Sequence, residues 1–131
     1  MKSNQVNDPN NPTASASSAP PNPCLDRAAN TAALKAVADD GISYLLPYSQ
    51  FLYAERSANA AVEKQPDAPP ERMLIRFASG DVAILGSGLK RVETDLQRYE
   101  LQFIKAVDRR LAATLETHIA AVTVTLTKEN V

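Results

Sequence analysis

The chain of 131 residues contains one cysteine, one histidine and no tryptophan. A single cysteine excludes a disulfide within the chain, and Cys24 alone cannot build a cysteine-based zinc site. Catalytic triads and most zinc sites need a histidine with well-placed partners, and the sequence places no such partners around His118. No other nucleophile or acid–base constellation is visible. We therefore predict a protein that is not an enzyme and that holds no cofactor and no metal.

Long apolar runs are also missing. No stretch approaches the length needed to cross a bilayer, and the N-terminus lacks the continuous apolar segment of a secretory signal. These absences predict a soluble, bacterial-like, cytoplasmic protein without membrane contact.

The first 23 residues have little to bury. They contain five of the nine prolines, with Met1 and Val6 as their only sizeable apolar side chains. So little apolar surface cannot offset the entropy lost on ordering the segment. We predict a disordered tail over residues 1–23 and a single domain over residues 24–131.

The first segment of the domain carries the punctuation of a helix. Asn22 can cap a helix, Pro23 suits its first position, and Gly41 suits its C-terminal stop. The run between them is rich in alanine and places small apolar residues at helical spacing. These signals predict a helix over residues 22–41.

Residues 42–55 (ISYLLPYSQFLYAE) form the most apolar and aromatic stretch of the chain. Their composition predicts a strand, and Pro47 restricts it to a sheet edge or a bulge. We therefore predict a long, bent edge strand that breaks near Pro47. Because an unpaired edge is a template for another chain, it is a candidate protein interface. Packing of the rings in the core is the alternative. The candidate residues are Tyr44, Tyr48, Phe51 and Tyr53.

The remaining sequence predicts further elements in order. Proline-rich residues 56–71 indicate a mobile loop, and the apolar runs on either side of Ser79-Gly80-Asp81 indicate a hairpin. Helical spacing begins at Leu89. We favour a helix to about Arg98 followed by a strand over residues 99–107, against one helix to about residue 118. A helix over residues 108–118 and a strand over residues 119–127 complete the chain.

These elements predict an α+β fold. It would contain a small, mostly antiparallel sheet of four or five strands and two or three helices behind the disordered tail. A strongly bent or barrel-like sheet is compatible with this pattern.

Residues 82–89 (VAILGSGL) run from an apolar strand through two glycines into a helical pattern, and Asp108 follows twenty-two residues beyond Gly86. This arrangement resembles the βαβ unit of dinucleotide-binding proteins, and the resemblance implies nucleotide binding at Gly86-Ser87-Gly88. Three features oppose it. Arg91 occupies the third glycine position, the hairpin makes the strand antiparallel to its neighbour, and few residues follow Asp108.

Residues 80–92 also resemble the second conserved box of Sm-like RNA-binding proteins, in which a strand ends at a turn that contacts RNA. Leu85 stands where that box has its arginine, and Gly88 stands where it has its asparagine. The resemblance therefore implies a small, strongly bent, ring-forming β-domain more than it implies RNA binding.

Positive charge is mildly concentrated in residues 72–110, with eight basic against five acidic side chains. Nucleic-acid binders usually concentrate positive charge more strongly. Lys90 and Arg91 fall in the first turn of a predicted helix, where the helix dipole disfavours positive charge. An acidic partner or ligand would relieve this conflict. The candidate anion or nucleic-acid contacts are Lys90, Arg91, Arg109 and Arg110.

The leading hypothesis is a non-catalytic binding or assembly module that associates with itself, or with another protein, through the edge strand 42–55. The alternative is a small nucleic-acid-binding β-domain that uses the four basic residues. A second alternative is nucleotide binding at Gly86-Ser87-Gly88.

Overall fold

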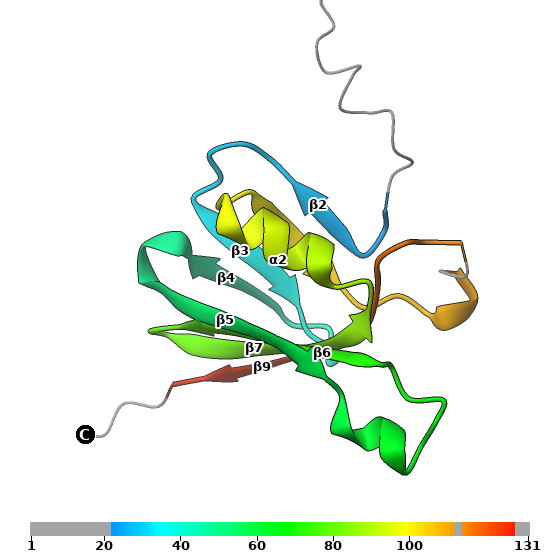
Figure 1. The fold of residues 1–131 in the computed structure, drawn as a ribbon. Coiled ribbons are helices and arrows are strands. Elements are labelled where there is room, and N and C mark those ends of the chain that lie inside the picture. The colour runs from blue at the N-terminus through cyan, green and yellow to red at the C-terminus, as the bar shows by residue number, and fades with distance from the viewer. Residues whose placement is uncertain (1–21, 112–113, 128–131) are drawn as a thin grey trace, which may run out of the picture.

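The computed structural model describes residues 22–111 and 114–127, so the predicted tail lies outside the described residues up to residue 21. The described chain forms two four-stranded sheets and one α-helix, α2 (Lys90–Gln97) (Figure 1). One sheet has the order β2 (Leu25–Arg27), β8 (Leu101–Lys105), β3 (Ala33–Val37), β4 (Ser43–Pro47). The other has the order β5 (Phe51–Ala58), β6 (Glu71–Phe77), β7 (Gly80–Ser87), β9 (His118–Leu126). Neighbouring strands are antiparallel except β3 and β8, which are parallel.

The α+β class agrees with this architecture only in its coarse form. A mostly antiparallel β structure with a helix was predicted correctly, but one sheet of four or five strands with two or three helices was wrong. The strand count was too low because β2 and β3 were taken as a helix, and because residues 42–55 were taken as one strand where β4 and β5 form. In the part of the chain that the structure describes, no helix is long and apolar enough to cross a membrane.

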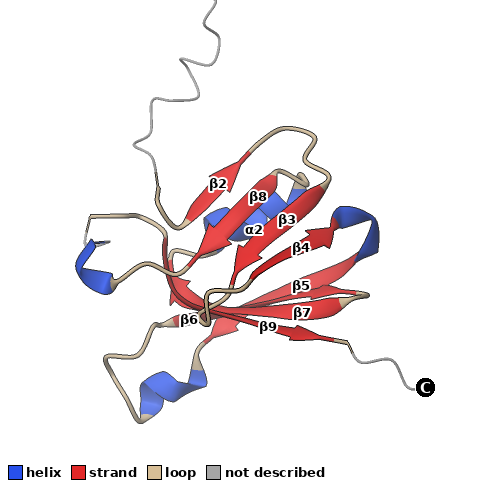
Figure 2. Ribbon diagram, turned by 180° about the vertical axis from the view of Figure 1, so that it is seen from behind, coloured by secondary structure: helices blue, strands red, loops and turns tan. Residues whose placement is uncertain are grey.

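The core lies where the two sheets and α2 meet. Figure 1 shows α2 in front of the β2-β8-β3-β4 sheet, and Figure 2 shows the same sheet from behind with its other face uncovered. Large buried side chains come from all three parts of this arrangement. They include Leu34 and Leu46 from the first sheet, Ile75, Phe77 and Ile84 from the second, and Leu89, Val92 and Leu96 from α2 and its N-cap.

The β6–β7 hairpin confirms its prediction. Ile75 lies opposite Val82 and Phe77 lies opposite Gly80, so the chain turns at residues 78–79. Alternation places Ile75, Phe77 and Val82 on the core face. The hairpin occupies the centre of its sheet, with β5 on one side and β9 on the other.

The predicted helix over residues 22–41 is wrong. The Asn22 side chain does accept a hydrogen bond from the Cys24 backbone N–H at 2.8 Å, but a short strand and not a helix follows. In β3 the buried residues alternate with exposed Lys35, which is a period of two. Small alanines give a helix only a narrow apolar face, whereas the strand gains hydrogen bonds to both β4 and β8. Gly41 at φ 88° turns the chain from β3 to β4.

The short helix and the following strand confirm the favoured interpretation of residues 89–107. Helix α2 ends in a Schellman motif, in which the Glu100 N–H donates to the Asp95 carbonyl at 2.8 Å. Tyr99 holds the left-handed position of this motif at φ 55°, where glycine is usual. Its ring lies 5.3 Å from the ring of Tyr48, and this packing favours an aromatic residue at a position that is strained for it.

The predicted helix over residues 108–118 is also wrong in the described residues. Only a 3₁₀ turn forms, η3 (Arg109–Leu111), and residues 112–113 lie outside the described chain. The segment has few large apolar side chains to anchor a helix, and Leu111 is exposed. The C-terminal strand is confirmed as β9.

The predicted loop over residues 56–71 is shorter than expected. Strand β5 continues to Ala58 and β6 begins at Glu71, and the connection contains a 3₁₀ turn, η2 (Ala60–Glu63). The Asn59 side chain braces the connection: it accepts from the Ala61 N–H and donates to the Pro69 carbonyl at 2.8 Å. The mobility of this connection stays a prediction.

Candidate functional site

The edge segment 42–55 supplies open edges to both sheets. Strand β4 ends the first sheet and β5 begins the second, so each has a hydrogen-bonded neighbour on only one side in the described chain. The 3₁₀ turn η1 (Tyr48–Gln50) joins them. Both ribbon views show β4 and β5 leaving this corner next to each other (Figures 1 and 2). The edge position and the break near Pro47 are confirmed, but one long, bent strand was wrong, because the segment forms two strands that belong to different sheets.

The hydrogen bonds at the two ends of β4 show which backbone groups are free. The Tyr48 N–H donates to the Ala32 carbonyl at 2.9 Å, and the Ala38 N–H donates to the Ile42 carbonyl at 2.9 Å. Hydrogen-bonded pairs alternate along an antiparallel ladder, so the even-numbered residues of β4 face β3. The N–H and carbonyl groups of Ser43 and Leu45 therefore point away from β3, toward the open edge of the sheet, together with the carbonyl of Pro47.

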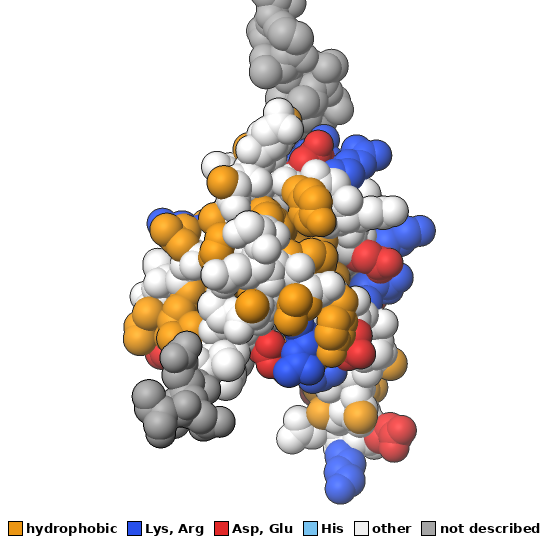
Figure 3. Space-filling model, turned by 90° about the vertical axis from the view of Figure 1, so that its left-hand side faces the viewer, with side chains coloured by type: hydrophobic (Ala, Val, Ile, Leu, Met, Phe, Trp, Pro, Cys, Tyr) orange, Lys and Arg blue, Asp and Glu red, His pale blue; other side chains and the backbone are white. Residues whose placement is uncertain are grey.

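Large apolar side chains are exposed along the same segment. Leu45 is 71% exposed and Leu52 is 61% exposed, and Ile42 and Tyr53 are also exposed. Figure 3 views the side of the molecule that carries the β4–β5 corner and shows hydrophobic side chains gathered over it. An apolar, unpaired strand edge is a surface on which another chain can pair.

The four aromatic candidates do not share this surface. Tyr48 is buried, and its hydroxyl donates to the Leu101 carbonyl at 2.6 Å. Burial raises the pKa of this phenol, with the charge of Asp95 as a smaller cause. Phe51 is half-buried against Phe77, with ring centroids 5.7 Å apart. Tyr48 and Phe51 therefore fit the alternative of core packing.

Tyr44 and Tyr53 remain closer to solvent. Tyr44 is half-buried and Tyr53 is exposed, with its hydroxyl accepting from Arg76 Nη1 at 3.1 Å. Sequence reasoning missed Leu45 and Leu52 because it weighted aromatic residues. The alternation of Ile42, Tyr44 and Leu46 already indicated that Leu45 faces the other way.

The four basic candidates lie in two different places. Lys90 and Arg91, in the first turn of α2, line a hollow together with Arg27 of β2. Arg109 lines a separate cavity. Arg110 contacts Asp108, and the backbone and side-chain hydrogen bonds from Arg110 lower the pKa of the Asp108 carboxyl. The structure therefore does not bring the four residues into one cavity.

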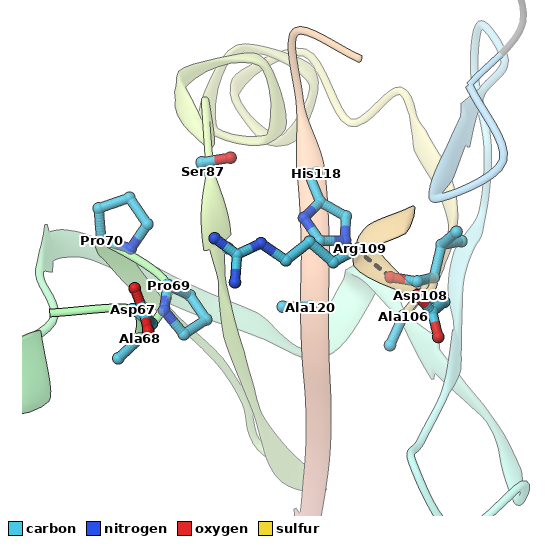
Figure 4. A pocket seen from close by; sticks show the side chains of 12 residues that line it. Asp67, Ala68, Pro69, Pro70, Ser87, Ala106, Asp108, Arg109, His118 and Ala120 are labelled. Carbon is cyan, nitrogen blue, oxygen red and sulfur yellow. Dashed lines mark hydrogen bonds between the residues drawn. The ribbon is translucent and has the colours of Figure 1, made fainter. Parts of the chain in front are cut away.

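The cavity beside Arg109 has a volume of about 660 Å³ and lies between β7, β9 and the end of the 59–70 connection (Figure 4). The Arg109 side chain reaches into it, with Ser87 and His118 above and Asp67 on the opposite wall. His118 Nε2 lies 2.7 Å from the Val107 carbonyl. Since a carbonyl only accepts, Nε2 carries a proton and donates.

The chemistry of this cavity is limited. No hydrogen bond joins Ser87 to His118 in the described chain, so they do not form a nucleophile–base pair there. Within residues 22–111 and 114–127, no three His, Cys, Asp or Glu side chains gather as a possible metal site. Cys24 is buried, and burial raises the pKa of its thiol. The absence of enzymatic activity stays a prediction.

The Gly86-Ser87-Gly88 turn has a structural explanation. A side chain at Gly86 would collide with the His118 carbonyl, and one at Gly88 would collide with the Glu116 carbonyl. Strand β7 is antiparallel to both its neighbours, and β8 lies in the other sheet. This geometry is not a parallel βαβ unit.

Comparison with protein-family models, curated proteins and solved structures found no significant match.

Proposed function

We propose that the protein is a non-catalytic assembly module that pairs with a second copy of itself through the open edge of β4. The observation that carries the proposal is Leu45. Its backbone N–H and carbonyl face away from β3, and its side chain is the most exposed large apolar side chain of the two sheets in the described chain. Pairing would satisfy the backbone groups and cover the side chain together.

The edge is self-complementary in one antiparallel register. With Leu45 opposite Leu45 of the second copy, the two leucines exchange two backbone hydrogen bonds. Each Ser43 N–H then donates to the Pro47 carbonyl of the other strand. Pro47 has no N–H, so the ladder does not extend further at that end.

Side chains on the uncovered face agree with this register. Lys35 lies beside Leu45 on the neighbouring strand β3. In the pair, two leucines would separate the two lysines, so like charges would not face each other. The two sheets would join into one continuous sheet across the two-fold axis.

The association should be weak. Each hydrogen bond contributes about 0.5–1.5 kcal/mol net, and association costs at least about 4 kcal/mol in lost rigid-body freedom. A few hydrogen bonds and a small apolar contact exceed that cost only slightly. We therefore expect a reversible dimer whose population depends on concentration.

Sedimentation velocity over a wide concentration range tests the proposal. Wild-type protein should pass from monomer to dimer, and Leu45→Lys should raise the dissociation constant at least about tenfold, about 1.4 kcal/mol. The new lysine would face its copy across the two-fold axis. Leu111→Lys is the matched control, because Leu111 is 73% exposed but lies on η3, away from β4. Wild-type protein that stays monomeric, or Leu45→Lys protein that associates normally, contradicts the proposal.

A further inference from the structure

A second site is formed where the N-terminus of α2 meets β2 and the strand-to-helix turn. The hollow there has a volume of about 430 Å³. Three of its side chains are basic, and two of these belong to the first turn of α2. Its lining consists of Arg27, Gly88, Lys90, Arg91, Thr94, Asp95, Glu116 and Thr117.

The carboxyl group of Asp95 lies in the wall of this hollow and is 1% exposed. Its Oδ1 accepts from Arg27 Nη1 at 3.5 Å, whereas its Oδ2 is buried and has no hydrogen-bond partner. Arg91 Nε lies 3.9 Å from Oδ2, too far for a hydrogen bond. A buried carboxylate oxygen without a donor is costly and calls for an explanation. Desolvation raises the pKa of Asp95, which is the expected result of that cost.

The first turn of α2 presents a second conflict at the same place. Lys90 and Arg91 put positive charge where the helix dipole favours negative charge. The Leu89 side chain at the N-cap position accepts no hydrogen bond from the helix, and the Leu89 N–H itself donates to Glu71 Oε1 at 2.9 Å. Lys90 and Arg91 of this first turn line the hollow, and the N-terminus of a helix is a place where backbone N–H groups bind anions.

We propose that this hollow binds a protonated oxyanion of the phosphate type. The guanidinium groups of Arg27 and Arg91, the Lys90 ammonium and the helix N–H groups take the anionic oxygens. The remaining P–OH group donates to Asp95 Oδ2. One ligand thus removes both conflicts.

Three features of the hollow bear on how the ligand is bound. Asp95 Oδ2 is buried with Arg91 Nε 3.9 Å away, so the Arg91 side chain must shift before a ligand can reach it. Arg91 is partly exposed, so a change of rotamer suffices. The lining contains two acidic side chains, the buried Asp95 and Glu116, and Glu116 is exposed to solvent. Asp95 contacts the ligand directly and also holds Arg27 at the wall.

This chemistry predicts discrimination between oxyanions of the same shape. Inorganic phosphate keeps at least one P–OH group near neutral pH, whereas sulfate keeps no proton and would place a fourth acceptor against Asp95. A phosphodiester has no P–OH group, so the backbone of a nucleic acid should bind poorly. A phosphomonoester loses its proton around pH 6 and should bind more weakly than phosphate above that pH.

Isothermal titration calorimetry of the full chain at pH 7 and fixed ionic strength is the test. Sodium phosphate should bind, and sodium sulfate should bind at least about tenfold more weakly, as the loss of a hydrogen bond to a charged group implies. Arg91→Gln should weaken phosphate binding about tenfold. Arg109→Gln is the matched control and should leave it unchanged, because Arg109 lines the other cavity.

Asp95→Asn adds a readout that a merely structural role would not change. An amide donates to an acceptor oxygen, so this variant should bind sulfate as well as phosphate. Circular dichroism checks its fold, and the comparison of anions on wild-type protein holds even if this variant unfolds. At pH 7 glycerol phosphate should bind more weakly than inorganic phosphate, because most of it has lost its P–OH proton, and equal affinity would contradict the contact with Asp95 Oδ2. Absence of phosphate binding, or equal phosphate and sulfate affinities in wild-type protein, overturns the proposal.

Discussion

The two sheet edges that meet at residues 48–50 are protected differently. Strand β4 contains no charged side chain and exposes Leu45. Strand β5 carries Glu55 and Arg56, and Arg56 Nε lies 2.6 Å from Glu93 Oε1 of α2. The contact with Glu93 is the main cause that raises the pKa of Arg56. Two neighbouring edges of the same chain thus differ in charge and in their connection to the helix.

The difference suggests which edge is available for pairing. Proteins guard free edges with charged side chains, proline and short strands. The β5 edge has a charged pair tied to the helix, whereas the β4 edge has only its short length and Pro47. If β5 is protected by charge and β4 is open, substitutions at the two edges must change self-association by unequal amounts.

The largest effect is expected at the corner that joins the two edges. Tyr48, the first residue of η1, packs against Phe51, Phe77 and Tyr99. Tyr48→Ala should lower the free energy of unfolding by about 3–5 kcal/mol, because it leaves a cavity in the core. Tyr48→Phe should cost only about 1 kcal/mol for the bond to Leu101. Urea denaturation measures both, and equal losses would show that the ring does not hold the corner.

A smaller effect, and a sharper comparison, comes from lysine on the β5 side. Leu52 is exposed at the start of β5, so Leu52→Lys matches Leu45→Lys in chemistry. We expect Leu52→Lys to change the dissociation constant by less than about threefold, within the small effect typical of surface substitutions. Sedimentation velocity on both variants is the measurement. If Leu52→Lys weakened association as much as Leu45→Lys, the interface would include β5 as well as β4.

The smallest effect is expected when the charged side chain of Arg56 is removed from the β5 edge. Arg56→Ala removes the contacts with Glu93 and Glu71 and leaves Glu55 as the one charged side chain of β5. We expect slightly increased association at high concentration, measured by light scattering, with little change in thermal stability because the pair is exposed. Arg98→Ala, on the exposed C-terminal side of α2, is the control. Unchanged scattering would mean that Arg56 does not guard the edge.

Sequence patterns predicted the fold where alternation or helical spacing was strong. The β6–β7 hairpin, α2, β8 and β9 all follow from apolar periods of two or about four. The prediction of a helix over residues 22–41 failed because Asn22 and Gly41, which were used as signals for the ends of a helix, are also common in turns. An alanine-rich strand has a weak pattern, and its pairing with β4 and with distant β8 cannot be seen locally.

The sequence predicted where the candidate site lies better than it predicted which side chains form it. Composition and Pro47 placed the edge correctly, but the side chain of Tyr48 went to the core to meet Leu101, which no local pattern indicates. The conflict of Lys90 and Arg91 with the helix dipole was visible in the sequence. The contact of Asp95 with Arg27, and the burial of Asp95, depend on tertiary structure, because β2 lies far from α2 in the chain.

Amide hydrogen exchange, measured by NMR at increasing protein concentration, tests the central claim most directly. At β4 the Ser43 and Leu45 N–H groups point away from β3, toward the open edge of the sheet. At β5 the Asn59 N–H donates to the Pro70 carbonyl, so the Ala54 and Arg56 N–H groups point outward there. We predict that protection of Ser43 and Leu45 rises with concentration while Ala54 and Arg56 keep exchanging fast. Fast exchange of Ser43 and Leu45 at every concentration would contradict pairing through β4.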